Sequence, residues 1–466
     1  MNIPFDPVFD QIPEPYATRA AAQLHALQSH SQGPPAYSVD QRGLPVPVWV
    51  RRGLPDEAGR AWEVLQTELH TAPRERPLCI YLHVPFCDSH CEFCDCYAFA
   101  LRRHRERHTQ SYTAHLCTEI GLWAGQVPLS RRPVTSIHFG GGTPTTLGWA
   151  NLERLVGVLG AHFSVGPQTE WALETTSSSL DEEAFARLHA LGFRRLHIGV
   201  QSLQDEVRQA IGRREPGAAA LQKIERARGL GWIVSVDVIT GLPGQTPAGL
   251  LDDLDRLVAS GAEGFSIYEL QHSSHNHRFF ESHNLLSQPV LRRYSLFQLA
   301  FQHLEAQGYT KNVFNHLARG RDRNLYFTFP QRGEDLLAIG TISDGVFGNY
   351  HYRHPEYWDY TRQVSPHDPG LLGGLRRTPQ EDRLHRIEVQ LMSGHVDPHT
   401  LGEILGEDQA TALLRKWLKH HMVAASPHGD GLALTTNGAW FIGQLLQEAI
   451  HCSSSTRPPG WTRLQE

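Results

Sequence analysis

Three cysteines lie at a spacing that suits an iron–sulfur cluster. Cys87, Cys91 and Cys94 follow the pattern C-x3-C-x2-C, and Cys96 comes two residues later. Three thiolates can hold three corners of a cubane cluster and leave the fourth iron without a protein ligand. A small molecule can chelate that open iron. The spacing therefore predicts a [4Fe–4S] metal site that takes part in chemistry as well as electron transfer.

A structural zinc site and a disulfide cluster are the alternatives for these cysteines. Structural zinc sites close four ligands, commonly from two C-x2-C pairs, and the sequence has no second pair. The run 78–85 (L-C-I-Y-L-H-V-P) before the cysteines is apolar, β-branched and aromatic, which indicates a buried strand that ends at the cysteine loop. This context favours the cluster.

Apolar strand-like runs alternate with amphipathic helices over residues 78–270. The expected strands are 79–84, 134–139, 169–174, 195–200, 232–238 and 263–269. The expected helices are 108–125, 148–162, 181–191, 204–212, 217–229 and 247–259. This alternation predicts an α/β fold with a parallel sheet and right-handed crossovers. Functional residues in such sheets lie at the carboxyl ends of the strands, where the motifs of this chain also fall.

The chain is expected to have three parts. Residues 1–75, rich in Pro, Gly and Gln, are expected to form an N-terminal arm with one helix at about 56–70. Residues 76–355 are expected to hold the barrel and short appended strands. Residues 356–466 are expected to form a small, mostly helical, winged-helix-like domain. Its expected elements are helices 378–394, 408–421 and 436–450 and a hairpin at 422–435.

Composition is typical of a large cytoplasmic enzyme. The chain has 466 residues, of which 40% are hydrophobic, and no apolar run long enough to span a bilayer. The N-terminus shows no signal peptide, and seven cysteines, four of them within ten positions, suit a reducing compartment. The formal charge of −6 gives no reason to expect a nucleic-acid or membrane partner.

Five motifs, in this order, resemble the radical S-adenosylmethionine (SAM) superfamily. They are Y-L-H-V-P-F-C-D-S-H-C-E-F-C-D-C (81–96), I-H-F-G-G-G-T-P-T (137–145), G-V-Q-S (199–202), D-V-I-T-G-L-P-G-Q-T (237–246) and E-D-L-L-A-I-G (334–340). More narrowly, residues 75–350 resemble the branch of oxygen-independent coproporphyrinogen III dehydrogenase, its heme-chaperone paralogue and class C radical SAM methyltransferases, including cyclopropanases. The resemblance implies an open (β/α)6 partial TIM barrel, a [4Fe–4S] cluster and SAM.

The resemblance also implies a set of cofactor-binding residues. They are Tyr81, Phe93, Gly140, Gly141, Gly142, Thr143, Glu174, Gln201, Arg213 and Asp237. The glycines allow a close backbone approach to a ligand, and Phe93 would shield the cluster edge. Arg213 and Arg214 are adjacent, so that assignment can fall on either. An acid such as Asp237 at a strand end needs a partner when it is buried.

Cys96 is outside the ligand spacing but matches a fourth cysteine of the dehydrogenase. It is a candidate catalytic residue near the substrate, and the alternative is a small loop residue that points away. Tyr350 and His351 are further catalytic candidates that could line a substrate pocket or transfer protons, although an aromatic surface loop explains them equally well. A metal site at His272, His275 and His277 is not favoured, because nothing fixes a coordination geometry.

Departures from the dehydrogenase at 268–277 and 323–355 favour the class C relatives. The first hypothesis is therefore a radical SAM enzyme that uses a second SAM to donate a methyl or methylene group to an unsaturated carbon of a small molecule, heteroaromatic, tetrapyrrole or other. The second is an oxidative decarboxylase of porphyrinogens, and the third, disfavoured by Cys96, is a heme-binding chaperone. An electron donor such as flavodoxin or ferredoxin is the expected protein partner.

Overall fold

The computed structural model describes residues 12–16, 18, 19, 37–39, 43–47, 49–71, 75–89, 91–101, 103–426, 429 and 431–453. Its contacts divide the chain into two units that are not contiguous in sequence. The larger unit holds residues 52–310 and 316–377, and the smaller holds 1–51, 311–315 and 378–466. Residues 52–75 and 356–377 thus belong with the barrel, and about half of the arm expected at 1–75 lies outside the described residues.

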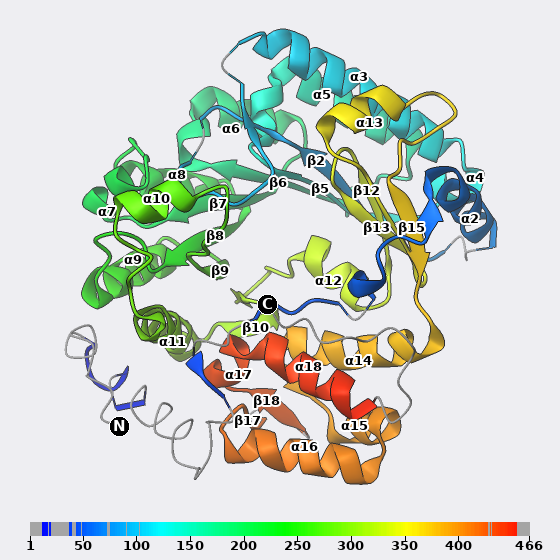
Figure 1. The fold of residues 1–466 in the computed structure, drawn as a ribbon. Coiled ribbons are helices and arrows are strands. Elements are labelled where there is room, and N and C mark those ends of the chain that lie inside the picture. Colours follow the sequence, from blue (N-terminus) through cyan, green and yellow to red (C-terminus); the bar gives the residue numbers. More distant parts are fainter. Residues whose placement is uncertain are drawn as a thin grey trace. The chain divides into compact units, whose positions relative to one another are not determined.

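A curved sheet forms the centre of the larger unit (Figure 1). Its six expected strands are present as β2 (Leu78–Val84), β5 (Val134–Gly141), β6 (Glu170–Thr176), β7 (Arg195–Gln201), β8 (Ile233–Thr240) and β9 (Gly264–Glu269). Each is parallel to the next in this order. Six neighbouring parallel strands confirm the expected partial-barrel architecture.

The sheet continues beyond the six strands on both sides. Strand β12 (Asp335–Ile339) pairs in parallel with β2 and adds a seventh parallel strand. Beyond it, antiparallel pairing joins β13 (Asp344–Phe347), β14 (Tyr350–Arg353), β15 (Gly373–Arg376) and β1 (Asp56–Glu57). On the other side, β11 (His316–Ala318) pairs antiparallel with β9. The extension keeps the edges of the six-stranded core paired, which limits exposed backbone.

Helices cover the outer face of this sheet in Figure 1. They follow the strands as α3 (Arg105–Ala124), α5 (Trp149–His162), α6 (Glu182–Ala190), α7 (Asp205–Ala210), α8 (Gly217–Gly229) and α9 (Pro247–Ala259). The remaining helices of the unit are α2 (Ala58–Thr71), α4 (Val127–Ser130), α10 (His277–Ser282), α11 (Val290–Ala306), α12 (Leu325–Gln331) and α13 (Tyr357–Gln363). Helix α5 buries one apolar stripe, formed by Leu152, Leu155 and Leu159. Helix α11 differs, because all of its side chains from Tyr294 to Leu304 are buried.

Buried polar bonds fix the carboxyl end of β2, where the cysteine loop begins. The Tyr112 hydroxyl of α3 donates to the His83 carbonyl at 2.8 Å and accepts from the Thr341 amide. On the same helix, the buried Glu119 carboxylate accepts from the Gly340 amide at 3.0 Å and from the Tyr360 hydroxyl at 2.6 Å. Fully paired buried groups of this kind rigidify their surroundings.

The smaller unit is mostly helical with a short antiparallel sheet. Its elements are α14 (Pro379–Ser393), β16 (His395–Val396), α15 (Pro398–Leu405), α16 (Glu407–Lys419), β17 (Val423–Ala425), β18 (Leu432–Leu434), α17 (Thr436–Trp440) and α18 (Ile442–Ser453). Strands β17 and β18 form the expected hairpin and β16 pairs with β18. A capping box between Thr378 and Glu381 starts α14.

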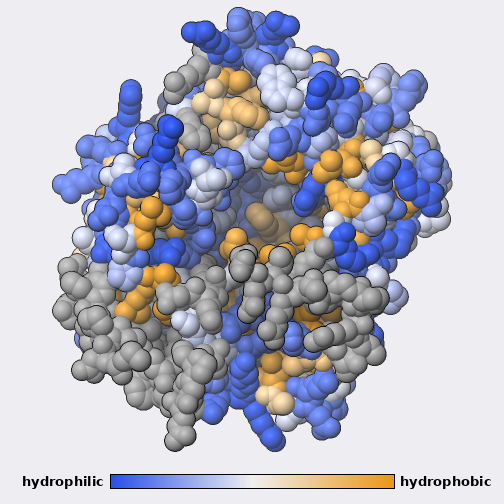
Figure 2. Space-filling view, in the orientation of Figure 1, coloured by the Kyte–Doolittle hydropathy of each residue, from blue (hydrophilic) through white to orange (hydrophobic). Residues whose placement is uncertain are grey.

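The coloured part of the face in Figure 2 is largely hydrophilic, and hydrophobic residues gather there in small separate groups. No helix among the described residues is both long enough and apolar enough to cross a membrane.

Candidate active site

The cysteine loop is tied to the end of the neighbouring strand. Cys87 ends the short strand β3 (Phe86–Cys87), which pairs with β4 (Phe99–Ala100) across the loop. The amides of Gly142 and Thr143 donate to the carbonyls of Val84 and Phe86, both at 2.7 Å. The Thr143 hydroxyl also lies 3.8 Å from the Cys87 sulfur. The G-G-G-T segment after β5 therefore sets the position of the first predicted cluster ligand.

Each glycine of this segment is packed against a different group. A Cβ on Gly140 would lie 2.7 Å from the Glu174 carboxyl carbon. A Cβ on Gly142 would lie 2.5 Å from the Phe86 carbonyl oxygen and 3.0 Å from the Cys87 sulfur. Gly141 has φ +105°, and a Cβ there would lie 2.6 Å from the His83 ring. Only glycine allows this approach of the backbone to the site.

Charge around the thiols is uneven. Burial raises the pKa of Cys87 to about 11. A hydrogen bond from Cys96 lowers the pKa of Cys94 to about 6 and raises that of Cys96. Arg213 hydrogen-bonds the Cys91 sulfur, which partly offsets the effect of burial on that thiol's pKa. A cationic neighbour favours thiolates, the form that binds iron.

No group of three His, Cys, Asp or Glu side chains in the described part of the chain closes around a single ion. A cubane cluster does not require such convergence, because each thiolate binds a different iron.

Phe93 belongs to an apolar cluster beside the loop. The cluster joins its ring, 8% exposed, to Val207, Ile211, Ile239, Leu242, Leu270, Phe279, Phe280 and Leu285, and Cys91 packs against it. Side chains of helices α7 and α10 thus surround the Phe93 ring beside the loop, and its role as a cover for the cluster edge stays a prediction.

Glu174 lies at the carboxyl end of β6, against the glycine segment. Its carboxylate accepts from the Gly141 amide at 3.0 Å and lies 2.9 Å from His138 Nε2. Burial alone would raise the pKa of Glu174, but the hydrogen bond and the charge of His138 outweigh it and hold the pKa below its usual value. Glu174 is thus an ionised acceptor at neutral pH.

Gln201 and Arg213 meet at the end of β7. The Arg213 guanidinium donates to the Gly199 carbonyl at 3.2 Å, and a Cβ on Gly199 would touch both side chains. Gln201 has φ +68°, a left-handed conformation that is uncommon outside glycine. Its Oε1 is buried and has no protein partner. An acceptor held this way at a strand end is suited to a ligand donor.

Asp237 on β8 pairs with His197 on the neighbouring strand β7. Its Oδ1 lies 2.6 Å from His197 Nε2, and its side chain is 23% exposed. Burial lowers the pKa of His197, but the Asp237 charge and hydrogen bond overcome this and raise it. Tyr268, 37% exposed on a strand that is otherwise buried, and Cys96 both lie within the electrostatic reach of Asp237 and Glu174. Cys96 therefore lies near these two carboxylates, and its catalytic role stays a prediction.

Tyr81 is placed by aromatic stacking, with Tyr326 at 4.2 Å between ring centroids. Its hydroxyl lies 3.0 Å from His83 Nδ1. Burial lowers the pKa of His83 to about 4, and its Nε2 has no protein partner. Sequence reasoning missed His83, His138 and His197. The signal that could have found them is spacing along the strand, because residues an even number of positions apart point to the same face of a sheet. Each of these histidines lies two or four positions from a predicted site residue on its own strand.

Tyr350 and His351 are not brought to the cysteine loop. The Tyr350 hydroxyl donates to Asp56 at 2.9 Å, and His351 Nε2 lies 3.0 Å from an Arg377 guanidinium nitrogen, on the antiparallel extension of the sheet. His275 lies near the loop, 3.7 Å from Asp95. His272 and His277 face each other at 2.9 Å.

Comparison with known proteins agrees with this geometry. The Radical SAM superfamily matches residues 81–257, which contain the three cysteines, the glycine segment, Glu174, Gln201 and Asp237. The chain carries a radical SAM domain. The expected cofactors, a [4Fe–4S] cluster and SAM, follow from this family, and a second SAM stays a prediction.

Curated relatives extend beyond the radical SAM domain. The oxygen-independent coproporphyrinogen III oxidase of Escherichia coli (strain K12) is 27% identical over 68% of this chain and 71% of its own length. An anaerobilin synthase of Escherichia coli O157:H7 is 28% identical over 84% of this chain and 87% of its own length. A solved structure of the Escherichia coli coproporphyrinogen III oxidase superposes with a TM-score of 0.72 at 22% identity, over 86% of this chain and 95% of that one, which supports the fold.

The residues present fit the cofactors of a radical SAM domain. Three thiols with a cation beside them provide the ligand set, and the glycine segment packs directly against Glu174, His83 and the cysteine loop, where any Cβ would overlap. His83 Nε2 and Gln201 Oε1 are buried polar atoms whose partners are not in the protein. Such atoms are costly unless a ligand or water pairs with them.

Proposed function

We propose that this chain is a radical SAM enzyme that acts on a tetrapyrrole. The observation that carries the proposal is the substrate class common to relatives whose alignments extend beyond the radical SAM domain. Coproporphyrinogen III is a cyclic tetrapyrrole, and a bilin is an open-chain one, so both kinds of relative are named for this class.

Within this proposal, Cys87, Cys91 and Cys94 hold the cluster, and Arg213 balances their charge. Glu174, Gln201 and Asp237 accept hydrogen bonds from the amino and ribose groups of SAM. When bound, the cluster and SAM together supply a 5′-deoxyadenosyl radical that removes a hydrogen atom from the substrate. Cys96 and Tyr268 lie on the side open to the tetrapyrrole. A low-potential protein such as flavodoxin or ferredoxin supplies the electron.

The first candidate reaction is oxidative decarboxylation of a porphyrinogen propionate. Several relatives from different bacteria support it, all of them oxygen-independent coproporphyrinogen III oxidases of 25–30% identity. It replaces methyl transfer as the first choice, because all of these relatives are named for the oxidation of coproporphyrinogen III.

The second candidate is methyl transfer to a tetrapyrrole carbon, with a second SAM. The alignment with the anaerobilin synthase covers more of this chain than the alignments with the porphyrinogen oxidases do, and this relative is named for a tetrapyrrole product other than theirs. The unpaired Gln201 Oε1 and the partly exposed Asp237 carboxylate also leave capacity for more than one ligand.

Product analysis distinguishes the two candidates. Reconstituted protein is incubated anaerobically with a strong reductant, methyl-labelled SAM and either coproporphyrinogen III or heme. Decarboxylation releases carbon dioxide, forms a vinyl product and leaves the label out of the tetrapyrrole. Methyl transfer places the label in the tetrapyrrole and forms S-adenosylhomocysteine. Tight heme binding without either product would contradict both and favour the chaperone.

A further inference from the structure

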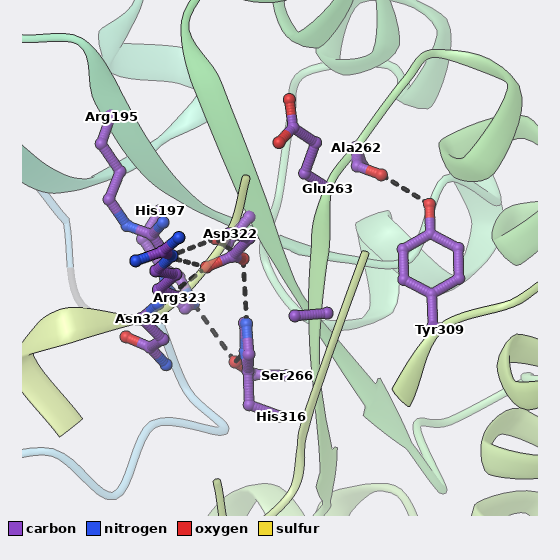
Figure 3. A network of polar contacts seen from close by, with 12 residues as sticks. Arg195, His197, Ala262, Glu263, Ser266, Tyr309, His316, Asp322, Arg323 and Asn324 are labelled. Carbon is purple, nitrogen blue, oxygen red and sulfur yellow. Dashed lines mark hydrogen bonds and ion pairs between the residues drawn. The ribbon is translucent and has the colours of Figure 1, made fainter. Parts of the chain in front are cut away.

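A chain of hydrogen bonds joins Asp322, His316, Ser266 and His197 (Figure 3). Ser266 on β9 is the direct register partner of Asp237 on β8 and of His316 on β11. Its Oγ lies 2.8 Å from His316 Nδ1 and 3.4 Å from His197 Nε2. Since His197 Nε2 is also 2.6 Å from Asp237, the chain joins His316 to a predicted SAM-binding carboxylate.

The hydrogen-bond chain begins at Asp322, which is buried and accepts from four donors. Its Oδ1 accepts from Arg195 at 2.6 Å and from the Asn324 amide at 2.9 Å. Its Oδ2 lies 2.6 Å from the Ser235 hydroxyl and 3.0 Å from His316 Nε2. Burial opposes the charge, but Arg195 and these hydrogen bonds hold the pKa of Asp322 well below its usual range. Asp322 therefore stays ionised.

The direction of every bond in the chain follows from this charge. An ionised carboxylate can only accept, so His316 donates from Nε2. Burial lowers the pKa of His316, and the neutral ring then presents a lone pair on Nδ1. Ser266 donates to that lone pair, and the lone pairs of its own oxygen are left for the Nε2 proton of His197. This arrangement keeps the proton of His197 on Nε2, the ring nitrogen that lies next to Asp237.

The turn that carries Asp322 is tightly packed. It lies in the turn between β11 and α12, where Arg321 is held by the Glu263 carboxylate at 2.8 Å. A side chain at Gly264 would overlap the Asp322 carboxylate and the His316 ring.

We propose that Asp322, His316 and Ser266 are positioning residues that fix Asp237, through His197, as a hydrogen-bond acceptor for SAM. The inference rests on the SAM-binding role that the proposed function gives to Asp237. The groups that face His197 are Asp237 on β8, Glu174 on β6, Arg195 on its own strand and His316 on β11.

Two serines provide a matched test. Ser266→Ala breaks the hydrogen-bond chain between His316 and His197. Ser235→Ala removes a donor to Asp322 Oδ2, the oxygen that also contacts His316, and leaves the bonds from His316 to His197 in place. Equilibrium dialysis of SAM against the cluster-loaded full chain is measured from pH 6 to 9, with thermal unfolding alongside. Ser266→Ala should weaken binding about five- to tenfold, in the range of one hydrogen bond, and the defect should grow as pH rises and His197 loses its second proton.

Ser235→Ala should lower thermal stability to a similar degree and leave the pH dependence of SAM binding as in the wild type. Ser266→Thr, which keeps the hydroxyl, should restore binding and also covers the case in which Ser266→Ala does not fold. If Asp237→Ala weakens binding but Ser266→Ala behaves like Ser235→Ala, the positioning role is overturned while the SAM site stands. If Asp237→Ala binds SAM as the wild type does, both the SAM role and this inference fail.

Discussion

The Asn276 side-chain amide donates to the Phe93 carbonyl at 3.0 Å, although the two residues are 183 positions apart. The same nitrogen donates to the Gln271 carbonyl at 2.8 Å, and Asn276 Oδ1 accepts from the Ser273 amide. Asn276 is 1% exposed. The loop after β9 is thereby bonded to the cysteine loop between Cys91 and Cys94, so one amide joins two sides of the predicted cluster site.

Asn276→Ala should make the cluster more labile. Loss of the amide leaves the Phe93 carbonyl unpaired in a buried position, which costs about 1–3 kcal/mol. Iron release to a chelator should be several-fold faster than in the wild type, and Ser282→Ala, which removes a local bond at the end of α10, is the control. Equal release rates in both variants would show that this contact does not secure the loop.

Single replacement of Cys87, Cys91 or Cys94 by Ala should abolish assembly of a cubane, because each thiolate holds a different iron. Iron content should fall from about four per chain, together with the visible charge-transfer absorption. Cys117→Ala on α3 is the control. Cys96→Ala should keep the cluster, since Cys96 only hydrogen-bonds Cys94, and a loss of iron in that variant would make Cys96 a ligand.

Gly142→Ala should impair both cluster assembly and SAM binding. The added Cβ would lie 2.5 Å from the Phe86 carbonyl oxygen and 3.0 Å from the Cys87 sulfur, so the loop must move. Gly157→Ala in α5, where nothing lies within 4 Å, is the matched control and should gain about 0.5–1 kcal/mol in stability. Normal iron and SAM binding by Gly142→Ala would refute the close packing described here.

The pair between His197 and Asp237 should make stability depend on pH. The folded-state pKa of His197 is raised, so its contribution is fully present below the unfolded value of about 6.5 and is lost as pH rises through the folded value. Asp237→Asn should therefore lower the melting temperature more at pH 6 than at pH 9. A difference that is the same at both values would mean that His197 is not charged by this pair.

The sequence predicted the parallel sheet well, for a physical reason. Strands buried on both faces are continuous apolar runs, and the helices between them keep a 3.6-residue period, so each of the six parallel strands was found within a few residues. The cysteines and the Gly140–Thr143 segment were found because metal ligation and close backbone approach demand residue types that nothing else replaces.

Long-range pairing was beyond the sequence. Nothing local indicates that β12 pairs with β2, or that a turn after β11 sends Asp322 to Arg195 on β7. Tyr350 and His351 were singled out as chemically able side chains, but their partners Asp56 and Arg377 come from β1 and from the chain after β15. Which side of a strand faces the site depends on these contacts, and composition does not reveal them.

The most direct test of the central claim is whether radical chemistry depends on a tetrapyrrole. Cluster-loaded protein is incubated anaerobically with reductant and SAM, with and without coproporphyrinogen III or heme, and 5′-deoxyadenosine and the tetrapyrrole are both quantified. The account predicts that the protein consumes one of the two tetrapyrroles. That tetrapyrrole should also raise the yield of 5′-deoxyadenosine at least about tenfold, which corresponds to a difference of 1.4 kcal/mol in barrier. The Cys91→Ala variant should show neither the consumption nor the rise in yield. A yield that is the same with and without tetrapyrrole, and with neither compound consumed, would contradict it.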